Sequence, residues 1–501
     1  MVAVVFNVAQ ICVSCRAMTT FENYINGEWR ASKSGKTFRN VNPANIEEVI
    51  GLFQSSNADD VDQACSAAAM ARNDWANLPA TKRGEYLFKA AEVIEARLPQ
   101  LAEEMTREEG KTLPEAIGEV KRALNIFRYF AGEGSRQFTY QVPSERENVL
   151  CYTIRKPLGV VALITPWNFP SAIPAWKIAP ALVTGNTVVI KPASLAPLSS
   201  LRLVEALHEA GIPPGVINYV TGSGGVVGDA LTSNAEIKAV SFTGSTSVGG
   251  SLYTKVAARR IRVQLEMGGK NPTVVLSDAD VDYAADILIN GAFFSTGQKC
   301  TACSRAIIER SIYEPLVAKL TEKTRRLKVG NGLEADVQIG PAVDAEQLKT
   351  DLEYIEVAKN EGAELLSGGR RLTGGDYDKG YFIEPTIFGG VKSNMRIAQE
   401  EVFGPVLALM VAEDFDDALR IANDVRFGLS ASIVSNDLTR VHQFINRIEA
   451  GLITVNLPTA GVEYQLPFGG TKESSYGMRE QGPQALEFYS ETRTVYLKHS
   501  F

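Results

Sequence analysis

The sequence predicts an α/β protein built on parallel sheets. From residue 158 onward, short β-branched runs alternate with stretches of helical spacing, a pattern typical of βαβ units around a buried parallel sheet. The chain has 501 residues, of which 45% are hydrophobic. That is enough for two or three domains with cores of their own.

The expected elements follow from the pattern of each segment. Residues 60–132 are charged, rich in alanine and spaced as helices. Strands, each followed by a helical stretch, are expected at GVVALI (159–164), TVVIK (187–191), VINYV (216–220) and KAVSF (238–242), with RIRVQLEM beginning at 260. A second α/β series runs from 272 to about 440. The strand-like segment 140–157 and the C-terminal TRTVYLKHSF are expected to add to a sheet outside either core.

Composition argues against several classes of function. The net charge of −7 and the pI near 5.4, without a run of Lys or Arg, argue against a general binder of nucleic acid or anionic membranes. No stretch approaches the roughly 18 apolar residues of a membrane span. Residues 1–17 lack a basic region ahead of their hydrophobic part, so we expect a disordered extension and not a signal peptide. Six cysteines without a dense framework fit a reducing cytoplasm.

Glycine-rich stretches raise the question of a phosphate-binding site. GKT occurs twice, but a Walker A motif needs a further Gly where Arg30 and Met105 stand, so that motif is rejected. In FTGSTSVGG, a strand ending at Phe242 leads through Gly244 into a helix, whose backbone N–H groups and positive end favour a phosphate. The G-x-G-x-x-G fingerprint is absent, and an ordinary capped helix start explains this stretch equally well.

Three further motifs follow strands, at the edge where α/β proteins build their sites. EMGGKNP places Glu266 at a strand end, as a general base or as a solvated acid. PWNFP sets Trp167 and Asn168 between prolines that force the chain out of the sheet, which makes Asn168 a candidate oxyanion donor or part of a rigid turn. KPAS places Lys191 where it contacts a ribose or phosphate, or only carries charge at a strand end.

Cys300 and Cys303 form a C-x-x-C in GQKCTACSR. Zinc needs three or four N or S ligands and none of the three histidines is near Cys300, so no metal site is predicted. A thioredoxin-like pair would lie near the start of a small βαβ domain, and a Cys–His protease would need a base that so few histidines do not supply. A lone nucleophile remains. Because free Cys is only about 3% thiolate at pH 7, it needs a lowered pKa or a base such as Glu266.

Together these stretches resemble the NAD(P)-dependent aldehyde dehydrogenase superfamily, from about residue 20 to the C-terminus. The motifs that carry the resemblance, in the family's order, are PWNFP, KPAS, FTGSTSVG, EMGGKNP, GQKC, EEVFGPV and PFGGTKESSYG. The resemblance implies an aldehyde dehydrogenase fold with a Rossmann-like cofactor domain, an α/β catalytic domain and a β oligomerisation arm. The expected boundaries are 18–133 and 158–268 for the cofactor domain, 269–483 for the catalytic domain, and 134–157 with 484–501 for the arm. It also implies a homodimer or homotetramer.

The same resemblance implies roles for individual residues. Cys300 would attack the aldehyde to give a thiohemiacetal, with its own N–H and Asn168 holding the oxyanion. Loss of hydride to the nicotinamide would leave a thioester that water activated by Glu266 would hydrolyse. Lys177 would support the site, and Cys303 has no required role. Cofactor contacts would come from Thr165, Trp167, Lys191, Ser194, Gly224, Gly244, Ser245, Glu401 and Phe403.

Ser194 bears on the choice between NADP and NAD. NAD-preferring members often carry Glu at this place, where a carboxylate accepts hydrogen bonds from the ribose diol and repels a 2′-phosphate. Ser leaves room for that phosphate beside Lys191, so the sequence predicts NADP preference with NAD tolerated.

The substrate is expected to be a semialdehyde. Succinate-semialdehyde dehydrogenases commonly hold the distal carboxylate with arginines at the places of Trp176 and Phe294, so that clamp is missing here. FFSTGQKCTA and the C-terminal tail resemble the 2,5-dioxopentanoate (α-ketoglutarate-semialdehyde) dehydrogenase group. Succinate semialdehyde, glyceraldehyde and aromatic aldehydes remain alternatives. The expected pocket residues are Phe169, Trp176, Phe294, Thr301 and Phe468.

Three other enzyme and protein classes fit less well. A CoA-acylating aldehyde dehydrogenase usually lacks the Glu, and a phosphorylating glyceraldehyde-phosphate enzyme uses a Cys–His pair. A non-catalytic structural homologue would be expected to lose Cys300 or Glu266, and both are present.

Overall fold

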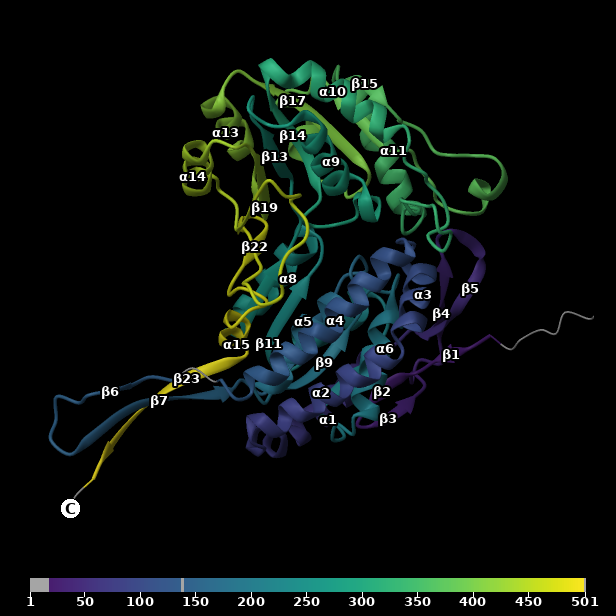
Figure 1. The fold of residues 1–501 in the computed structure, drawn as a ribbon. Coiled ribbons are helices and arrows are strands. Elements are labelled where there is room, and N and C mark those ends of the chain that lie inside the picture. The colour runs from purple at the N-terminus through teal and green to yellow at the C-terminus, as the bar shows by residue number, and fades with distance from the viewer. Residues whose placement is uncertain (1–17, 137–138, 500–501) are drawn as a thin grey trace, which may run out of the picture.

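The computed structural model describes residues 18–136 and 139–499; the extension predicted at 1–17 lies outside them. Two α/β lobes stand one above the other, and a narrow arm leaves the lower lobe to one side (Figure 1). Each lobe contains a large sheet with a parallel centre. The α/β fold class predicted from the sequence is therefore confirmed.

The lower lobe contains an eight-stranded sheet whose middle five strands are parallel. In spatial order these five are β12 (Arg262–Glu266), β11 (Ile237–Thr243), β8 (Val160–Ile164), β9 (Thr187–Lys191) and β10 (Ile217–Tyr219). The chain builds outward from β8 through β9 to β10, then crosses to the other side of β8 for β11 and β12. Open α/β sheets bind ligands at such a reversal of strand order, outside the carboxyl ends of the strands.

Short antiparallel strands extend this sheet at both edges. They are β22 (Ser475–Tyr476) beyond β12, and β2 (Asn23–Ile25) with β3 (Glu28–Arg30) beyond β10. The pairing of β22 with β12 shows that the chain returns to the lower lobe after the upper sheet is built. A separate small sheet contains β1 (Thr20–Phe21), β5 (Asn45–Gln54) and β4 (Thr37–Asn42).

Helices cover both faces of the lower sheet. Along β8, Val161 and Leu163 belong to one core, whereas Val160 and Ala162 belong to the other, as the alternation of side chains along a strand requires. The first core includes α2 (Ala80–Ala96), α3 (Leu98–Glu109), α4 (Leu113–Glu133), α5 (Ala172–Val183) and α6 (Pro197–Glu209). The second includes α1 (Ala58–Asn77), α7 (Asp229–Ser233) and α8 (Thr246–Ala258).

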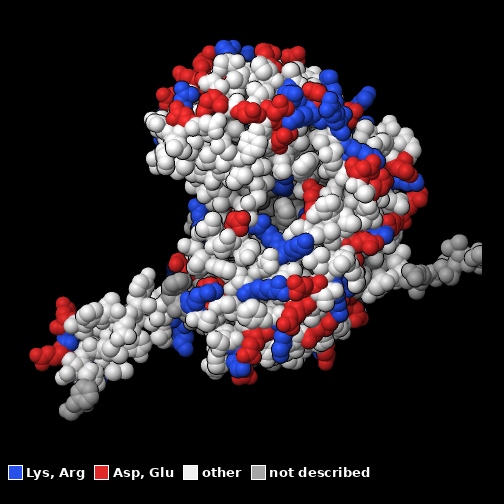
Figure 2. All heavy atoms as spheres, viewed as in Figure 1, with Lys and Arg blue, Asp and Glu red and all other residues white. Residues whose placement is uncertain are grey.

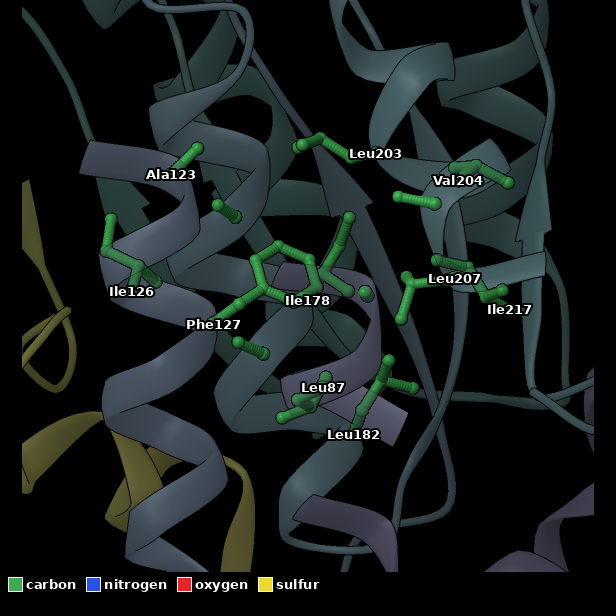
Figure 3. Packing of buried hydrophobic residues seen from close by; sticks show 14 of the residues in the cluster. Leu87, Ala123, Ile126, Phe127, Ile178, Leu182, Leu203, Val204, Leu207 and Ile217 are labelled. Carbon is green, nitrogen blue, oxygen red and sulfur yellow. The ribbon is translucent and has the colours of Figure 1, made fainter. Parts of the chain in front are cut away.

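The first core fixes α5 in place. Phe127 of α4 and Ile178 of α5 share this buried cluster with Leu203 of α6 (Figure 3). Burying a Phe, Ile or Leu side chain stabilises a fold by about 1.5–3 kcal/mol. Because α5 carries Trp176 and Lys177, this packing positions two of the predicted site residues.

The upper lobe contains a seven-stranded sheet, parallel except for its edge strand β15. The order is β15 (Glu364–Ser367), β16 (Thr386–Gly389), β17 (Val406–Ala412), β14 (Cys303–Glu309), β13 (Asn271–Val275), β19 (Ser430–Val434) and β20 (Leu452–Val455). One face packs on α9 (Val281–Ala292) and α10 (Arg310–Thr324). The other packs on α11 (Ala345–Asn360), α12 (Arg396–Gln399), α13 (Phe415–Asn423) and α14 (Leu438–Arg447).

The arm is a three-stranded antiparallel sheet of β23 (Ser490–Lys498), β7 (Val149–Pro157) and β6 (Gln141–Val142). β7 and β23 pair residue for residue, from Pro157 opposite Ser490 to Val149 opposite Lys498. The arm projects from the body (Figure 1) and exposes apolar side chains that include Tyr496. Its predicted role in assembly, like the predicted domain boundaries, stays a prediction.

Among the described residues, no helix has both the length and the apolar character needed to cross a bilayer.

Candidate active site

The candidate catalytic residues come from facing ends of the two large sheets. Asn168 follows β8 and Glu266 ends β12 in the lower sheet, whereas Cys300 precedes β14 in the upper sheet. The surface is hollowed between the lobes, with basic side chains at the edge of the recess (Figure 2). The carboxyl ends of the lower strands thus approach the amino end of β14.

The turn before Cys300 has an uncommon backbone. Ser295, Thr296 and Gly297 have φ angles of 55°, 56° and 66°, in the left-handed region that costs non-glycine residues about 1–3 kcal/mol each. The Ser295 N–H donates to Glu115 Oε1 at 2.7 Å. A Cβ at Gly297 would stand 2.3 Å from Gly404 O. The surrounding structure therefore imposes this turn and, with it, the position of Cys300.

Amide side chains hold the main chain on both sides of Cys300. Asn271 Nδ2 donates to Cys300 O at 2.8 Å, and the Val343 N–H donates to Gln298 Oε1 at 2.9 Å. Asn168 Nδ2 donates to Gln298 O at 3.1 Å. Since an amide nitrogen carries two N–H groups, Asn168 keeps one for an oxyanion formed near Cys300.

Cys300 is partly exposed, yet its thiol lies among negative groups and close-packed atoms. Burial raises the pKa of the thiol to about 12, and the Glu401 and Glu266 carboxyls add to this rise, while N–H groups of Thr301 and Cys300 oppose it. The thiol is therefore neutral at pH 7 in this environment. Nucleophilic attack by Cys300 requires a proton acceptor.

Glu266 has the properties of such an acceptor. It is 2% exposed, and the Ser475 hydroxyl donates to its Oε2 at 2.5 Å. Burial raises the pKa of Glu266 well above its usual range, and the nearby Glu480 carboxyl raises it further. A carboxylate whose pKa is raised is a stronger base, so it accepts a proton from a donor more readily.

Lys177 lies in a buried network beside Glu266. Its ammonium group pairs with Glu480 and donates to Ser241 Oγ at 2.7 Å, and the Lys177 and Glu480 side chains are 0% and 2% exposed. The Trp176 indole N–H donates to the same Glu480 at 2.7 Å. The positive charge of Lys177 lowers the pKa of Glu266, whereas the negative charge of Glu480 raises it.

Lys191 and Ser194 follow the carboxyl end of β9. Lys191 is 4% exposed, its ammonium group donates to Pro192 O at 2.7 Å, and burial lowers its pKa to about 8. Ser194 Oγ donates to Gly222 O at 3.1 Å. An ammonium group has three donors, so Lys191 keeps two for a ligand.

The reversal of strand order carries unpaired hydroxyl groups. Thr165 follows β8 and Thr243 ends β11, and the buried hydroxyl of each has no hydrogen-bond partner within residues 18–136 and 139–499. The Thr165 N–H donates to Lys191 O at 3.1 Å, which ties this edge to the Lys191 position. Buried polar groups are normally paired, so these hydroxyls fit a polar ligand.

The start of α8 adjoins this edge. Gly244 donates its N–H to Glu266 O at 3.0 Å, and Ser245 caps α8 by accepting the Val248 N–H at 3.4 Å. The other first-turn N–H groups have no partner within the helix and favour a phosphate. Val248 is 53% exposed, which leaves an apolar surface on the first turn.

Gly224 lies in a π-helical turn, η1 (Gly224–Gly228), that continues into α7. A Cβ at Gly224 would meet nothing within 4 Å. Val226 of the same turn is 48% exposed. Because α7 packs on α8, the open turn and the exposed Val248 belong to one region. Free hydroxyls, spare ammonium donors, a helix N-terminus and apolar surfaces fit a dinucleotide cofactor.

The aldehyde dehydrogenase family model matches residues 29–495. The chain belongs to the aldehyde dehydrogenase family. It is accordingly an NAD(P)-dependent aldehyde oxidoreductase, and the resemblance inferred from seven motifs is confirmed.

Three similar curated proteins are named as semialdehyde or 2,5-dioxopentanoate dehydrogenases. An alpha-ketoglutaric semialdehyde dehydrogenase of Bacillus subtilis is 50% identical over 479 residues, covering 96% of this chain and 98% of that protein. An alpha-ketoglutarate semialdehyde dehydrogenase of Haloferax volcanii is 48% identical over 95% of this chain and 98% of its own. A 2,5-dioxopentanoate dehydrogenase of Saccharolobus solfataricus is 47% identical over 92% of this chain and 96% of its own.

Solved structures share the fold. An NAD-dependent aldehyde dehydrogenase of Sinorhizobium meliloti superposes with a TM-score of 0.94 at 35% identity, covering 96% of this chain and 95% of that one. A betaine aldehyde dehydrogenase of Staphylococcus aureus in complex with NAD+ gives 0.93 at 35% identity, covering 96% and 95%. The predicted aldehyde dehydrogenase fold is confirmed.

In this aldehyde dehydrogenase, Glu401 and Phe403 bridge the loops of the two lobes. Glu401 Oε1 accepts the Gly269 N–H at 2.9 Å, and burial raises the pKa of Glu401 to about 7. A Cβ at Gly268 would stand 2.1 Å from Glu401 Oε2. Phe403 has a φ of 63° and meets the Trp167 ring edge-on, with centroids 5.4 Å apart.

The five predicted pocket residues have different environments. The Trp176 and Phe468 rings lie with centroids 5.4 Å apart, and the Lys111 ammonium stands 4.5 Å from the centre of the Phe169 ring. Phe294 begins the left-handed turn before Cys300, and Thr301, next to Cys300, is 6% exposed. The indole N–H of Trp176 is occupied by Glu480 and is not available to a substrate.

Cys303 packs into the upper core. It is 2% exposed, its thiol donates to Arg305 O at 3.5 Å, and burial raises its pKa to about 11. Both Cys300 and Cys303 are free thiols. The C-x-x-C spacing therefore does not bring a second exposed thiol to the recess.

Sequence reasoning missed the residues that support this site. Glu480 lies 303 positions from Lys177 and Ser475 lies 209 positions from Glu266. On α4, Glu119 Oε1 accepts the N–H groups of Ser171 and Ala172 at 2.8 and 3.0 Å, at the start of α5. The helical spacing of α4 was visible in the sequence, but no local signal indicates contacts across such distances.

Proposed function

We propose that this aldehyde dehydrogenase oxidises 2,5-dioxopentanoate to 2-oxoglutarate, preferring NADP and tolerating NAD. The substrate assignment rests on the 47–50% identity, over nearly the whole chain, to proteins named for that semialdehyde. Trp176 and Phe294 stand where a succinate-semialdehyde enzyme would be expected to carry arginines. This difference favours the longer oxo acid over succinate semialdehyde.

The first half of the reaction is addition. The Cys300 thiol loses its proton to Glu266, directly or through water, and its sulfur forms a bond to the aldehyde carbon. The carbonyl oxygen becomes an oxyanion that accepts the free Asn168 N–H, and one such donor is worth about 2.7–4 kcal/mol in a transition state. A nicotinamide bound at the cofactor edge supplies the acceptor for the hydride that the substrate carbon loses.

The second half is hydrolysis of the thioester that remains on Cys300. Glu266 first passes the Cys300 proton to solvent, and it then takes a proton from the water molecule whose oxygen attacks the thioester carbon. The carbon–sulfur bond then breaks, which releases the carboxylic acid, and Glu266 returns its proton to the Cys300 sulfur. Lys177 and Glu480 act on this step by setting the charge around Glu266.

NADP preference rests on Lys191 and Ser194. A 2′-phosphate would accept the spare Lys191 donors and replace some of the solvation that this buried ammonium lacks. Ser194 is neutral, whereas Glu would repel the phosphate. Ser194→Glu should move the ratio of kcat/KM for NADP and NAD toward NAD by about 10-fold or more. A wild type that strongly prefers NAD would refute the proposal.

The substrate is tested by steady-state NADPH formation with 2,5-dioxopentanoate, succinate semialdehyde, glyceraldehyde and benzaldehyde. The highest kcat/KM is expected for 2,5-dioxopentanoate. If succinate semialdehyde is favoured by orders of magnitude, the substrate assignment is wrong.

For assembly, the proposal is a homodimer or homotetramer formed through the arm. The arm exposes Tyr140, Val142, Leu150, Tyr496 and Leu497, and exposed apolar strands favour pairing. Light scattering should give a dimer or tetramer for the wild type and smaller species for Leu150→Asp with Tyr496→Asp. A wild-type monomer would contradict it.

A further inference from the structure

A substrate with a carboxylate requires a cation, and most cations near the catalytic residues already have partners. The Lys111 ammonium pairs with Glu119 and Glu109, and Lys177 pairs with Glu480. The Lys299 ammonium donates to Asn290 O at 3.1 Å. Arg479 donates to Gly470 O, beside Glu266, whose pKa it lowers.

Arg122 of α4 differs from these groups. Its Nη2 donates to Val462 O, but its Nε is enclosed and has no hydrogen-bond partner among the residues that the structure describes. In the described part of the chain, Arg122 forms no ion pair, although Glu463 and Glu119 are near enough to affect its pKa. Burial lowers the pKa of Arg122, and Glu463 and Glu119 oppose this only in part. Arg122 is partly exposed, and a partly buried guanidinium group that lacks an ion pair favours an anionic ligand.

Residues 459–464, which contact Arg122 through Val462 O, extend from the neighbourhood of Cys303 to α4. Near the start of this segment, Thr459 and Cys303 both lie close to Gly291. A Cβ added to Gly291 would stand 3.7 Å from Thr459 Oγ1 and 3.0 Å from Cys303 Cβ. Val462 follows three residues later. At its end, the Tyr464 ring meets Tyr129 of α4, with centroids 5.7 Å apart.

On the α4 side, Arg122 lies one turn after Glu119, on the same face of the helix. Glu119 accepts the first N–H groups of α5, directly after PWNFP, and binds the Lys111 that also donates to Asn168 O at 2.8 Å. The same stretch of α4 packs on α5 through Ala123, Ile126 and Phe127 (Figure 3). Arg122 thus lies between two parts of the site. On one side are Glu119 and Lys111, which support Asn168, and on the other is segment 459–464, which begins beside Cys303.

We infer that Arg122 is a specificity-determining residue that binds the carboxylate of 2,5-dioxopentanoate, with the adjacent 2-oxo oxygen as a second acceptor. The inference rests on the proposed function. An α-oxo acid presents two oxygens side by side, and the planar fork of a guanidinium group matches such a pair. An ammonium group carries the same charge without this fork, so Lys is an incomplete replacement.

The test compares Arg122→Met and Arg122→Lys with wild type on three five-carbon aldehydes: 2,5-dioxopentanoate, 5-oxopentanoate and pentanal. Arg122→Met keeps most of the aliphatic stem and should lower kcat/KM for both acids by roughly 10- to 100-fold, mainly through KM. Pentanal, which has no carboxylate, should change less than about twofold. Arg122→Lys should recover part of the loss, more for 5-oxopentanoate than for the α-oxo acid.

Lys121→Met is the matched control, because it removes a positive charge from the neighbouring, exposed position of α4. It should leave all three substrates unchanged. An equal loss on pentanal with Arg122→Met would make Arg122 structural, and unchanged kinetics on both acids would place the anchor elsewhere. If Arg122→Met does not fold, retention of wild-type kinetics on both acids by Arg122→Lys overturns the inference. A wild type that prefers pentanal would overturn the substrate itself, and the anchor with it.

Discussion

Replacing Glu480 by Gln tests the buried network most directly. The Glu480 carboxylate accepts from Trp176 at 2.7 Å, from Ser241 at 3.2 Å and from the Lys177 ammonium, and both charged side chains are at most 2% exposed. The amide of Gln has a single oxygen, which faces either Trp176 or Lys177, and in both orientations the negative charge beside Lys177 is lost. Leaving one charge of a buried pair uncompensated costs about 3–5 kcal/mol. We expect the free energy of unfolding to fall by that amount.

The loss is measured by urea unfolding at pH 7, followed by tryptophan fluorescence. Lys177→Met alone should cost a similar amount, and the double variant should cost at least about 2 kcal/mol less than the sum of the singles. The matched control is Asp229→Asn, which breaks the exposed Lys255–Asp229 pair and should leave the transition unchanged. Strict additivity of the two single losses would refute a coupled buried pair.

Further predictions concern the nucleophile, the oxyanion donor and a buried acid. Cys300→Ala should abolish turnover while Cys303→Ala keeps most of it; the reverse result would overturn the assignment. Asn168→Ala should lower kcat by about 10²- to 10³-fold without unfolding the protein, since Lys111 binds the Asn168 main-chain oxygen; unchanged kcat would exclude the oxyanion role. Burial raises the pKa of Asp351 from 3.8 to about 8, although Gln347 Nε2 donates a hydrogen bond to this carboxyl group. Between these values the folded state holds a proton that the unfolded state has lost, so stability falls as pH rises from about 4 to about 8. Asp351→Asn should flatten that dependence in unfolding measurements from pH 5 to 8, and an unchanged slope would argue against a neutral Asp351.

Much of the fold could be predicted because the signals are local. The β-branched runs TVVIK and KAVSF mark buried parallel strands, and Glu266 and Asn168 lie at strand ends as the sequence suggests. The left-handed turn before Cys300 could not be predicted, because Ser and Thr rarely adopt that region and tertiary contacts from Glu115 and Gly404 impose it.

The residues that surround the catalytic groups could not be predicted from the sequence for a related reason. Lys177 reads locally as one polar position in an apolar helix, and only the folded chain shows that Glu480 neutralises it. Arg122 likewise reads as an ordinary charged position of an amphipathic helix. Burial and pairing over hundreds of positions are tertiary properties, and the spacing of residues does not encode them.

The pairing of β22 with β12 has a consequence for biosynthesis. Ser475 and Glu480 adjust the proton affinity of Glu266, but Ser475 is made 209 residues after it. A nascent chain can therefore build the parallel strands of the lower sheet while Glu266, the proposed general base, still lacks these neighbours. The proposed hydrolytic step therefore depends on β22 and the residues after it returning to a sheet whose other strands are made earlier.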